Sequence, residues 1–215
     1  MRATALILCG GRATRMGGVD KPLQPFLGRP LVAHVIERLA PQTGGRVLIS
    51  ANRHLSDYRR LGFPVLPDAL PGFPGPLAGI LAGLSALSAL SALADESGGH
   101  DADDAWLLAA SGDSPWLPID LLERLAAGLA PGQTAAMALG REGPGEPLRS
   151  QPLASLIHVS HREALAAALQ SGERRVEGWL RTLPLARVSF DRPEDDRAFA
   201  NINDRSELER LERLR

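Results

Sequence analysis

The chain has 215 residues, of which 44% are hydrophobic and 23% charged, and its formal net charge is -1. This length permits one large domain or two small ones. The near-neutral charge removes any global electrostatic argument for a nucleic-acid partner. Because Cys9 is the single cysteine, an intramolecular disulfide and a cysteine-based zinc cluster are both excluded.

The start of the chain has a strand, helix, strand pattern. Apolar runs at 4–9 and 46–51 predict strands, and the periodic segment 30–39 predicts a helix between them. The strands lack a regular alternation of polar and apolar residues, which is typical of a parallel sheet covered on both faces. No leader-peptide cleavage site follows the first apolar run, so we expect a cytoplasmic protein.

The middle of the chain continues the alternation. A short helix at 55–61 and a short strand lead to a long apolar helix at 77–94, and a strand follows at 105–111. The long helix approaches the length of a membrane span, but it is mostly Ala, Gly and Ser interleaved with Leu. We therefore expect a buried helix of a soluble domain, followed by a solvated acidic loop at 95–104.

The last third is less regular. The expected elements are a helix at 119–129, a strand at 134–139, a turn-rich segment at 141–152, a strand at 153–159, a helix at 161–170, a strand at 186–190 and a final helix from Ser206. No Gly/Ser linker divides the chain. We expect one α/β domain over residues 1–215, a Rossmann-like three-layer αβα sandwich with a mostly parallel sheet and antiparallel additions in the C-terminal third.

A glycine-rich loop follows the first predicted strand. The stretch LCGGRATRMGGVDK at 8–21 combines glycines, which let a backbone approach a ligand, with the fixed charges of Arg15 and Lys21. It matches neither the dinucleotide fingerprint nor the Walker loop, because its glycines fall at other spacings and Pro22 follows Lys21. The pattern fits a long loop around a triphosphate and, alternatively, an exposed loop with solvated cations.

Several motifs together resemble those of the molybdenum cofactor guanylyltransferases, a family with the nucleotide-diphospho-sugar transferase-like fold. The motifs are L-x-G-G-x-x-x-R-M-G-G-x-D-K at 8–21, SANRH at 50–54, Asp68, GPLAG at 75–79, SGDSP at 111–115, GERRV at 172–176 and FANIN at 199–203. They follow the family's order and span almost the whole chain. The resemblance implies that the terminal phosphate of molybdopterin attacks the α-phosphate of GTP, so that GMP joins the pterin and pyrophosphate leaves.

The resemblance also implies site residues on the nucleotide side. It places GTP contacts at Leu8, Cys9, Gly10, Gly11, Lys21, Ser50, Asn52, Asp68, Gly75, Gly79 and Asp113. Arg15, Lys21 and Asp113 are the expected catalytic residues: the two cations neutralise phosphate charge, and Asp113 holds Mg²⁺ as the cofactor. Asp113 also follows a predicted central strand, where ligands bind in open α/β sheets. The alternative for Asp113 is an ordinary turn residue before Ser114 and Pro115.

Other nucleotide-side residues have structural alternatives as well. Ser50 and Asn52 can cap the helix that follows SANRH, and Gly75 and Gly79 can serve turns or close packing. Ser50 stands where relatives can carry a longer asparagine. Cys9 replaces the usual alanine of the family, and we expect it to be packed, without a redox or nucleophilic role.

On the acceptor side, the resemblance implies that Arg174, Arg175, Asn201 and Asn203 bind molybdopterin. An exposed helix start is the alternative for the arginine pair. The sequence continues NINDRSEL where a threonine-proline pair is commoner after the second asparagine. We expect residues 1–115 to form a nucleotide-binding half and residues 116–215 an acceptor half.

The expected partners are GTP and molybdopterin, with molybdenum-insertion proteins and apo-molybdoenzymes as candidate protein partners, and neither nucleic acid nor a membrane. Three other functions remain open, of which a nucleotidyltransferase that uses a sugar phosphate or a polyol phosphate is the more distant enzyme. A cytidylyltransferase would use CTP on the same scaffold, and a non-catalytic module would bind nucleotide and deliver the cofactor. The L-x-G-G and R-M-G-G-x-D-K motifs favour GTP by resemblance.

Overall fold

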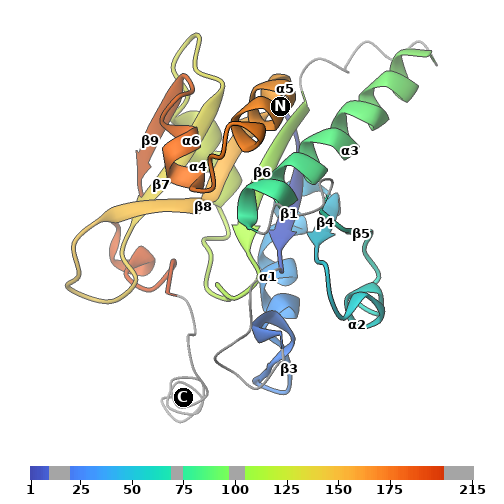
Figure 1. Ribbon diagram of the computed structural model, residues 1–215. Coiled ribbons are helices and arrows are strands. Elements are labelled where there is room, and N and C mark those ends of the chain that lie inside the picture. The colour runs from blue at the N-terminus through green and yellow to red at the C-terminus, as the bar shows by residue number, and fades with distance from the viewer. Residues whose placement is uncertain (10–19, 69–74, 97–104, 201–215) are drawn as a thin grey trace.

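The computed structural model describes residues 1–9, 20–68, 75–96 and 105–200. Within these residues, one sheet has the strand order β5-β4-β1-β6-β8-β7-β9 (Figure 1). The strands are β1 (Arg2–Leu8), β4 (Val47–Ser50), β5 (Val65–Leu66), β6 (Ala105–Ser111), β7 (Ala135–Gly140), β8 (Arg149–His158) and β9 (Leu185–Ser189). All pair in parallel except β8, which is antiparallel to both of its neighbours. A small antiparallel hairpin, β2 (Pro25–Phe26) and β3 (Arg29–Pro30), stands apart from this sheet.

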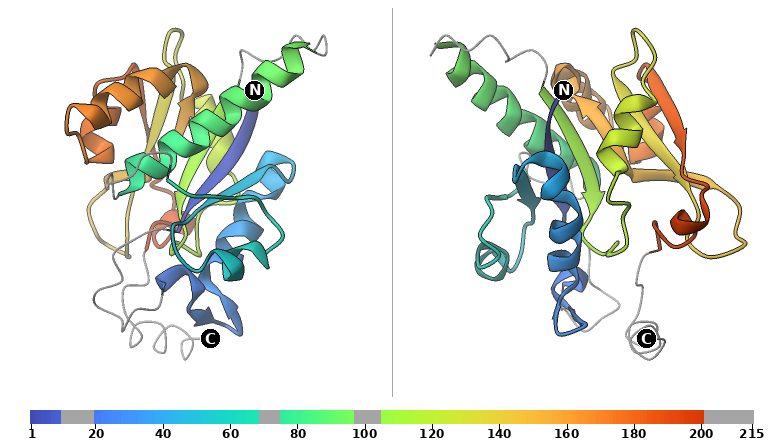
Figure 2. Two further views of the ribbon diagram at one scale, coloured as in Figure 1. Left: turned by 45° about the vertical axis from the view of Figure 1, so that its right-hand side comes forward. Right: turned by 180° about the vertical axis from the view of Figure 1, so that it is seen from behind.

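Helices cover both faces of the sheet. They are α1 (Leu31–Leu39), α2 (Leu55–Arg59), α3 (Pro76–Glu96), α4 (Leu121–Ala127), α5 (Arg162–Gln170) and α6 (Val176–Leu180). Helices α1, α2 and α4 share one core cluster with one set of strand side chains, whereas α3, α5 and α6 share a second cluster with the other set. The front view in Figure 1 and the rear view in Figure 2 show these two layers on opposite sides of the sheet.

Strand β1 shows why the sequence gives this layering. Its side chains alternate between the two clusters: Ala5 and Ile7 face the α1 side, and Leu6 and Leu8 face the α3 side. All four are buried, so the strand reads as one apolar run with no polar face. The predicted three-layer αβα sandwich with a mostly parallel sheet and an antiparallel addition in the C-terminal third is confirmed.

Helix α3 agrees with the expected buried helix at 77–94. Ile80 and Leu84 are fully buried against the sheet. Among the described residues, no helix combines the length and the apolar character that crossing a bilayer requires.

The prediction of turns at 141–152 is wrong at its end, because β8 already begins at Arg149. The first residues of β8 pair with the end of β7 beyond a register shift between Met137 and Ala138. Ser150 and Gln151 are only half-buried there, so their polar side chains are tolerated in a strand. The expected helix from Ser206 lies outside the described residues.

Candidate active site

The register of the central strands brings three predicted segments to one edge of the sheet. Leu8 pairs with Ser50 on one side and with Ser111 on the other. Beyond the strands, Cys9 N–H donates to the Ser50 carbonyl at 2.8 Å, and Gly112 N–H donates to the Leu8 carbonyl at 3.0 Å. The segments that follow β1, β4 and β6 therefore leave the sheet side by side at its carboxyl edge, where ligands bind in open α/β sheets.

A lysine and a carboxylate meet at this edge. Lys21 Nζ lies 2.6 Å from Asp113 Oδ2, and the two side chains are 23% and 18% exposed. Ser111 donates its hydroxyl proton to Asp113 Oδ1 at 2.6 Å. Both carboxylate oxygens are thus oriented, while the pair stays open to solvent on one side. Such a partly exposed ion pair stabilises a fold only modestly.

Lys21 is held in place by the residue before it. Asp20 is only 4% exposed, and its Oδ1 accepts from Arg53 Nη2 at 2.7 Å. The Tyr58 hydroxyl lies 3.5 Å from Asp20 Oδ2 and 3.3 Å from the Cys9 carbonyl, and its single proton serves one of them at a time. A buried carboxylate needs such partners, so Asp20 anchors the chain directly before Lys21 to α2 and the SANRH segment.

Sequence reasoning missed this anchor. Asp20 and Arg53 lie inside the quoted motifs, but neither was assigned a role, and Tyr58 lies outside them. Burial raises the pKa of Tyr58 above its ordinary range, so the hydroxyl stays protonated and remains a donor. Charged residues next to predicted site residues are the signal that could have identified Asp20 and Arg53.

Asn52 and Asp68 are also brought together. Asp68 N–H donates to Asn52 Oδ1 at 2.8 Å, which ties the segment after β5 to the segment after β4. Burial raises the pKa of Asp68. Helix α2 has His54 as its N-cap and no side-chain capping bond, so the capping alternative for Ser50 and Asn52 is not observed.

The two glycines of GPLAG are required for different structural reasons. Gly75 has φ 141°, a backbone conformation that other residues rarely adopt, directly before α3. At Gly79 a Cβ atom would overlap Ser50 Oγ and approach Leu8 Cδ2 to 2.7 Å. Gly79 thus allows α3 to pack closely on the ends of β1 and β4, which agrees with the close-packing alternative. Ser50 is buried beneath it.

A pocket of about 220 Å³ lies against β8 and reaches Ser111, the residue that bonds the Asp113 carboxylate. It is lined by polar side chains that include Ser111, Ser114 and Gln151, and by the ring of Phe199. Because Ser111 also bonds the carboxylate of Asp113, the pocket and the ion pair share a wall. A molecule bound in this pocket would thus contact Ser111, the residue that bonds the Asp113 carboxylate.

The predicted acceptor arginines are not joined to Asp113 by the hydrogen bonds described here. Arg174 and Arg175 are exposed just before α6, and their backbone N–H groups both donate to Glu173 Oε1 at 2.8 Å. Arg174 Nη1 also donates to the Leu169 carbonyl at 2.9 Å. This arrangement matches the exposed helix-start alternative, and their contact with an acceptor stays a prediction.

Five predicted site residues lie outside the described residues. They are Gly10, Gly11, Arg15, Asn201 and Asn203. Over the ranges that are described, no group of three or more His, Cys, Asp or Glu side chains forms a metal cluster. Mg²⁺ needs no such cluster, since it is commonly held by one or two carboxylates together with substrate phosphates and water. Asp113 at an open edge fits that donor set.

The fold and the site together define a class, the α/β proteins that bind nucleotides at the open carboxyl edge of the sheet. Comparisons with known proteins identify the family within this class. The MobA-like NTP transferase domain model matches residues 5–188. A molybdenum cofactor guanylyltransferase of Ralstonia nicotianae is 44% identical over 212 residues, which cover 97% of this chain and 95% of that protein. The corresponding protein of Cupriavidus taiwanensis is 43% identical over 206 residues, covering 95% and 94%.

A solved structure agrees at the level of the fold. Molybdopterin-guanine dinucleotide biosynthesis protein A of Archaeoglobus fulgidus superposes with a TM-score of 0.72 at 20% identity, covering 98% of this chain and 97% of that one. The chain therefore belongs to the MobA-like NTP transferases and, among them, to the molybdenum cofactor guanylyltransferase family.

The environment of Cys9 gives a testable prediction. The residue is buried, and burial, aided by the charge of Asp113, raises the pKa of its thiol well above the ordinary value. A free thiol is substantially ionised at about pH 8, whereas Cys9 stays protonated and shielded. Ellman's reagent should therefore react far more slowly with the native protein than with the protein in denaturant. Equal rates in the two states would show that Cys9 is accessible and contradict this packing.

Proposed function

We propose that this protein transfers GMP from GTP to the terminal phosphate of molybdenum-loaded molybdopterin, releases pyrophosphate and forms molybdopterin guanine dinucleotide. The observation that carries the proposal is the Lys21–Asp113 pair at the edge where the β1, β4 and β6 segments converge. The names of the relatives support the same reaction. In the transfer, an acceptor phosphate oxygen bonds to the α-phosphorus as the bond to the β-phosphate oxygen breaks, and pyrophosphate leaves with that electron pair.

Charge neutralisation is the main requirement of this reaction. Negative charge gathers on the α-phosphoryl group and on the leaving pyrophosphate. Lys21 offers three donors on a flexible stem, so its ammonium can exchange the Asp113 carboxylate for a phosphate oxygen when nucleotide arrives. The anchored Asp20 keeps the start of this stem in place during the exchange. We assign Arg15 as the second cation.

Asp113 is the proposed ligand of Mg²⁺. The Ser111 hydroxyl fixes one carboxylate oxygen, and release of Lys21 toward the phosphates would leave the other for the metal. When bound there, Mg²⁺ would supply charge neutralisation and polarise the phosphoryl group.

The nucleotide side of the site comprises the backbone of 8–11 and the Asn52–Asp68 pair. The Asp68 N–H bond holds the Asn52 amide in a fixed orientation, as a group that selects a base or ribose requires. Gly75 allows the turn directly before α3, and Gly79 allows the start of α3 to pack closely on Ser50 at the end of β4. These contacts support an assignment of residues 1–115 to GTP.

The acceptor side is assigned to residues 116–215. Its support is the pocket near Asp113, whose serine, glutamine and aromatic residues suit a pterin ring, whereas its one charged lining residue, Glu142, requires that the cations for the phosphate lie outside the pocket. Arg174 and Arg175 are the proposed cations for the pterin phosphate, and Asn201 and Asn203 add polar contacts. We place the reaction in the cytoplasm, with molybdenum-insertion proteins and apo-molybdoenzymes as partners.

Nucleotide choice tests the proposed function. The purified protein is incubated with molybdopterin, molybdate, Mg²⁺ and equimolar GTP and CTP, and the pterin products are identified by mass spectrometry. The guanine dinucleotide should be the main product. A cytosine dinucleotide would make the protein a cytidylyltransferase, and nucleotide binding without any adduct would favour the delivery module.

Substitutions of the ion pair test the roles of its two members. Asp113→Asn and Lys21→Met should each lower kcat about a hundredfold or more, because each removes a group that meets developing charge. Of the two, only Asp113→Asn should shift the Mg²⁺ dependence to higher concentration. Asp57→Asn, which weakens exposed pairs with Arg60 and His54 at the two ends of α2, is the matched control and should retain activity. Wild-type kcat in Asp113→Asn at low Mg²⁺ would contradict the metal assignment.

A further inference from the structure

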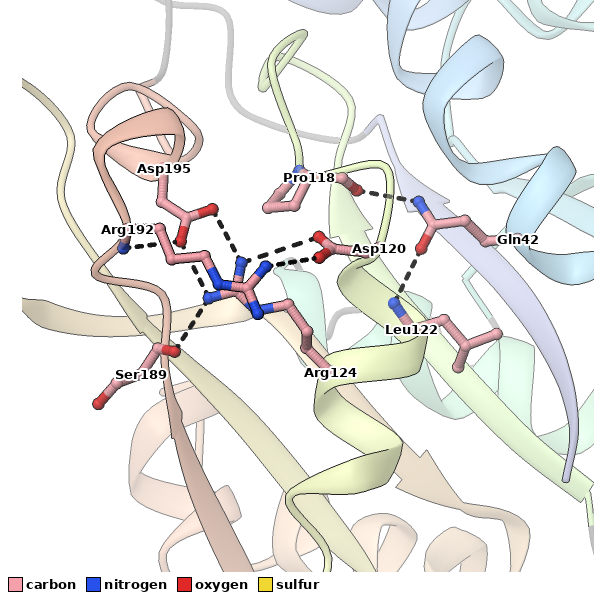
Figure 3. Close-up of polar contacts among 8 residues, drawn as sticks. All are labelled: Gln42, Pro118, Asp120, Leu122, Arg124, Ser189, Arg192 and Asp195. Carbon is pink, nitrogen blue, oxygen red and sulfur yellow. Dashed lines mark hydrogen bonds and ion pairs between the residues drawn. The ribbon is translucent and has the colours of Figure 1, made fainter.

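A half-buried arginine ties α4 to the chain beyond β9. Arg124 forms a two-pronged ion pair with Asp195, with Nη1–Oδ1 and Nη2–Oδ2 distances of 2.9 Å each (Figure 3). The two side chains are 11% and 3% exposed. Arg124 Nη2 also donates to the Ser189 carbonyl at 3.2 Å. We call the Arg124–Asp195 pair the clamp.

The clamp is supported on both of its sides. Asp195 Oδ2 accepts a further bond from the Arg192 N–H at 3.1 Å, which fixes the turn that carries it. On the other side, α4 is held at its start by Gln42, which accepts from Leu122 N–H at 2.8 Å and donates to the Pro118 carbonyl at 2.9 Å. The side chains in Figure 3 therefore link the first half of the chain to the segment after β9.

The segment after β9 packs into the core cluster on the α1 side through Phe190, Ala198 and Phe199. A hollow of about 420 Å³ lies beside it, lined by Trp116, Asp120 and Ala198 together with both clamp residues. Taking two charges out of water is costly, so a nearly buried pair at this point indicates a demand for a defined position.

The position that the clamp defines is that of Phe199. The Arg124 guanidinium lies 3.9 Å from the centre of the Phe190 ring, and Phe190 meets Phe199 edge to face at 5.4 Å between ring centres. Phe199 is nearly buried against Gly140, where a Cβ atom would overlap its ring. Absence of a side chain at Gly140 therefore leaves the space that the ring occupies.

Phe199 is also a wall of the pocket that reaches Ser111. An unbroken series of contacts thus runs from the clamp through two aromatic rings to the proposed acceptor site. None of the clamp residues lines that pocket or contacts Lys21 or Asp113 in the described structure. Among the described contacts, Phe199 is the pocket residue through which the clamp can influence the reaction.

The geometry points to Arg124 and Asp195 as positioning residues for the acceptor: the clamp sets the place of Phe199 and, through it, the affinity for molybdopterin, but not the affinity for GTP. This inference rests on the proposed function. It differs from a general structural role, because loss of the clamp changes one substrate's KM and leaves the other unchanged.

The test compares Arg124→Gln, Asp195→Asn and the double variant with the wild type in the formation of the guanine dinucleotide. Each single variant should raise the KM for molybdopterin about tenfold, and the double variant should add little, because the pair acts as a unit. Arg124→Lys keeps the charge but loses the two-pronged geometry, so its KM for molybdopterin should lie between those of the wild type and Arg124→Gln. The KM for GTP and the kcat at saturating molybdopterin should stay unchanged.

Gly140→Ala acts on the same ring from the opposite side and leaves the clamp intact, so it should also raise the KM for molybdopterin. If the clamp variants do not fold, Gly140→Ala and Phe199→Leu provide the test. Arg162→Gln removes an exposed pair with Glu163 at the start of α5 and is the matched control. Denaturant unfolding of every variant shows that the assays report on folded protein.

The outcomes separate the two proposals. If the wild type makes no dinucleotide, the proposed function fails and this inference fails with it. If the wild type makes it but the clamp and Gly140 variants keep the wild-type KM for molybdopterin, only this inference is overturned. A parallel rise in the KM for GTP would also overturn it, since that result indicates a general loss of structure.

Discussion

The parallel pairing of β1 with β4 and β6 is the constraint on which the rest of the site depends. It sets Leu8, Ser50 and Ser111 at one level, so the three following segments leave the sheet together. If β1 shifted by one residue, the side chains that now pack against α1 would face α3, and those that pack against α3 would face α1. Packing on both faces therefore fixes the register, which places Asp113, and the Asp20 anchor places Lys21 beside it.

The Lys21–Asp113, Arg53–Asp20 and Arg124–Asp195 ion pairs differ in burial, and the difference suits their proposed roles. The Lys21–Asp113 pair is partly exposed and can exchange partners with a ligand. In the other two pairs the carboxylate is almost fully buried, at Asp20 and at Asp195, and further donors satisfy it. A buried charge is costly to separate from its partner, so these two pairs are suited to holding a segment in place. The site thus combines an exchangeable pair with fixed ones on its two sides.

The sequence predicted the layers of the fold and the place of Asp113 because both follow from local patterns. Apolar runs without polar alternation indicate a parallel sheet, and a carboxylate after a central strand lies at its carboxyl edge. The early start of β8 could not be predicted, since Arg149 and Ser150 are polar and extend only through pairing with β7. The Asp20 anchor and the Arg124 clamp join residues far apart in sequence, and no local spacing reveals such contacts.

The central claim is that this edge of the sheet catalyses attack on the α-phosphate of GTP. It is tested most directly with GTP radiolabelled at the α-phosphate in one reaction and at the γ-phosphate in another, each with molybdopterin and Mg²⁺. We expect the α label to enter the pterin product and the γ label to leave in pyrophosphate. A γ label on the pterin would show phosphoryl transfer in place of nucleotidyl transfer, and an unlabelled pterin in both reactions would show no transfer; either result would contradict the account.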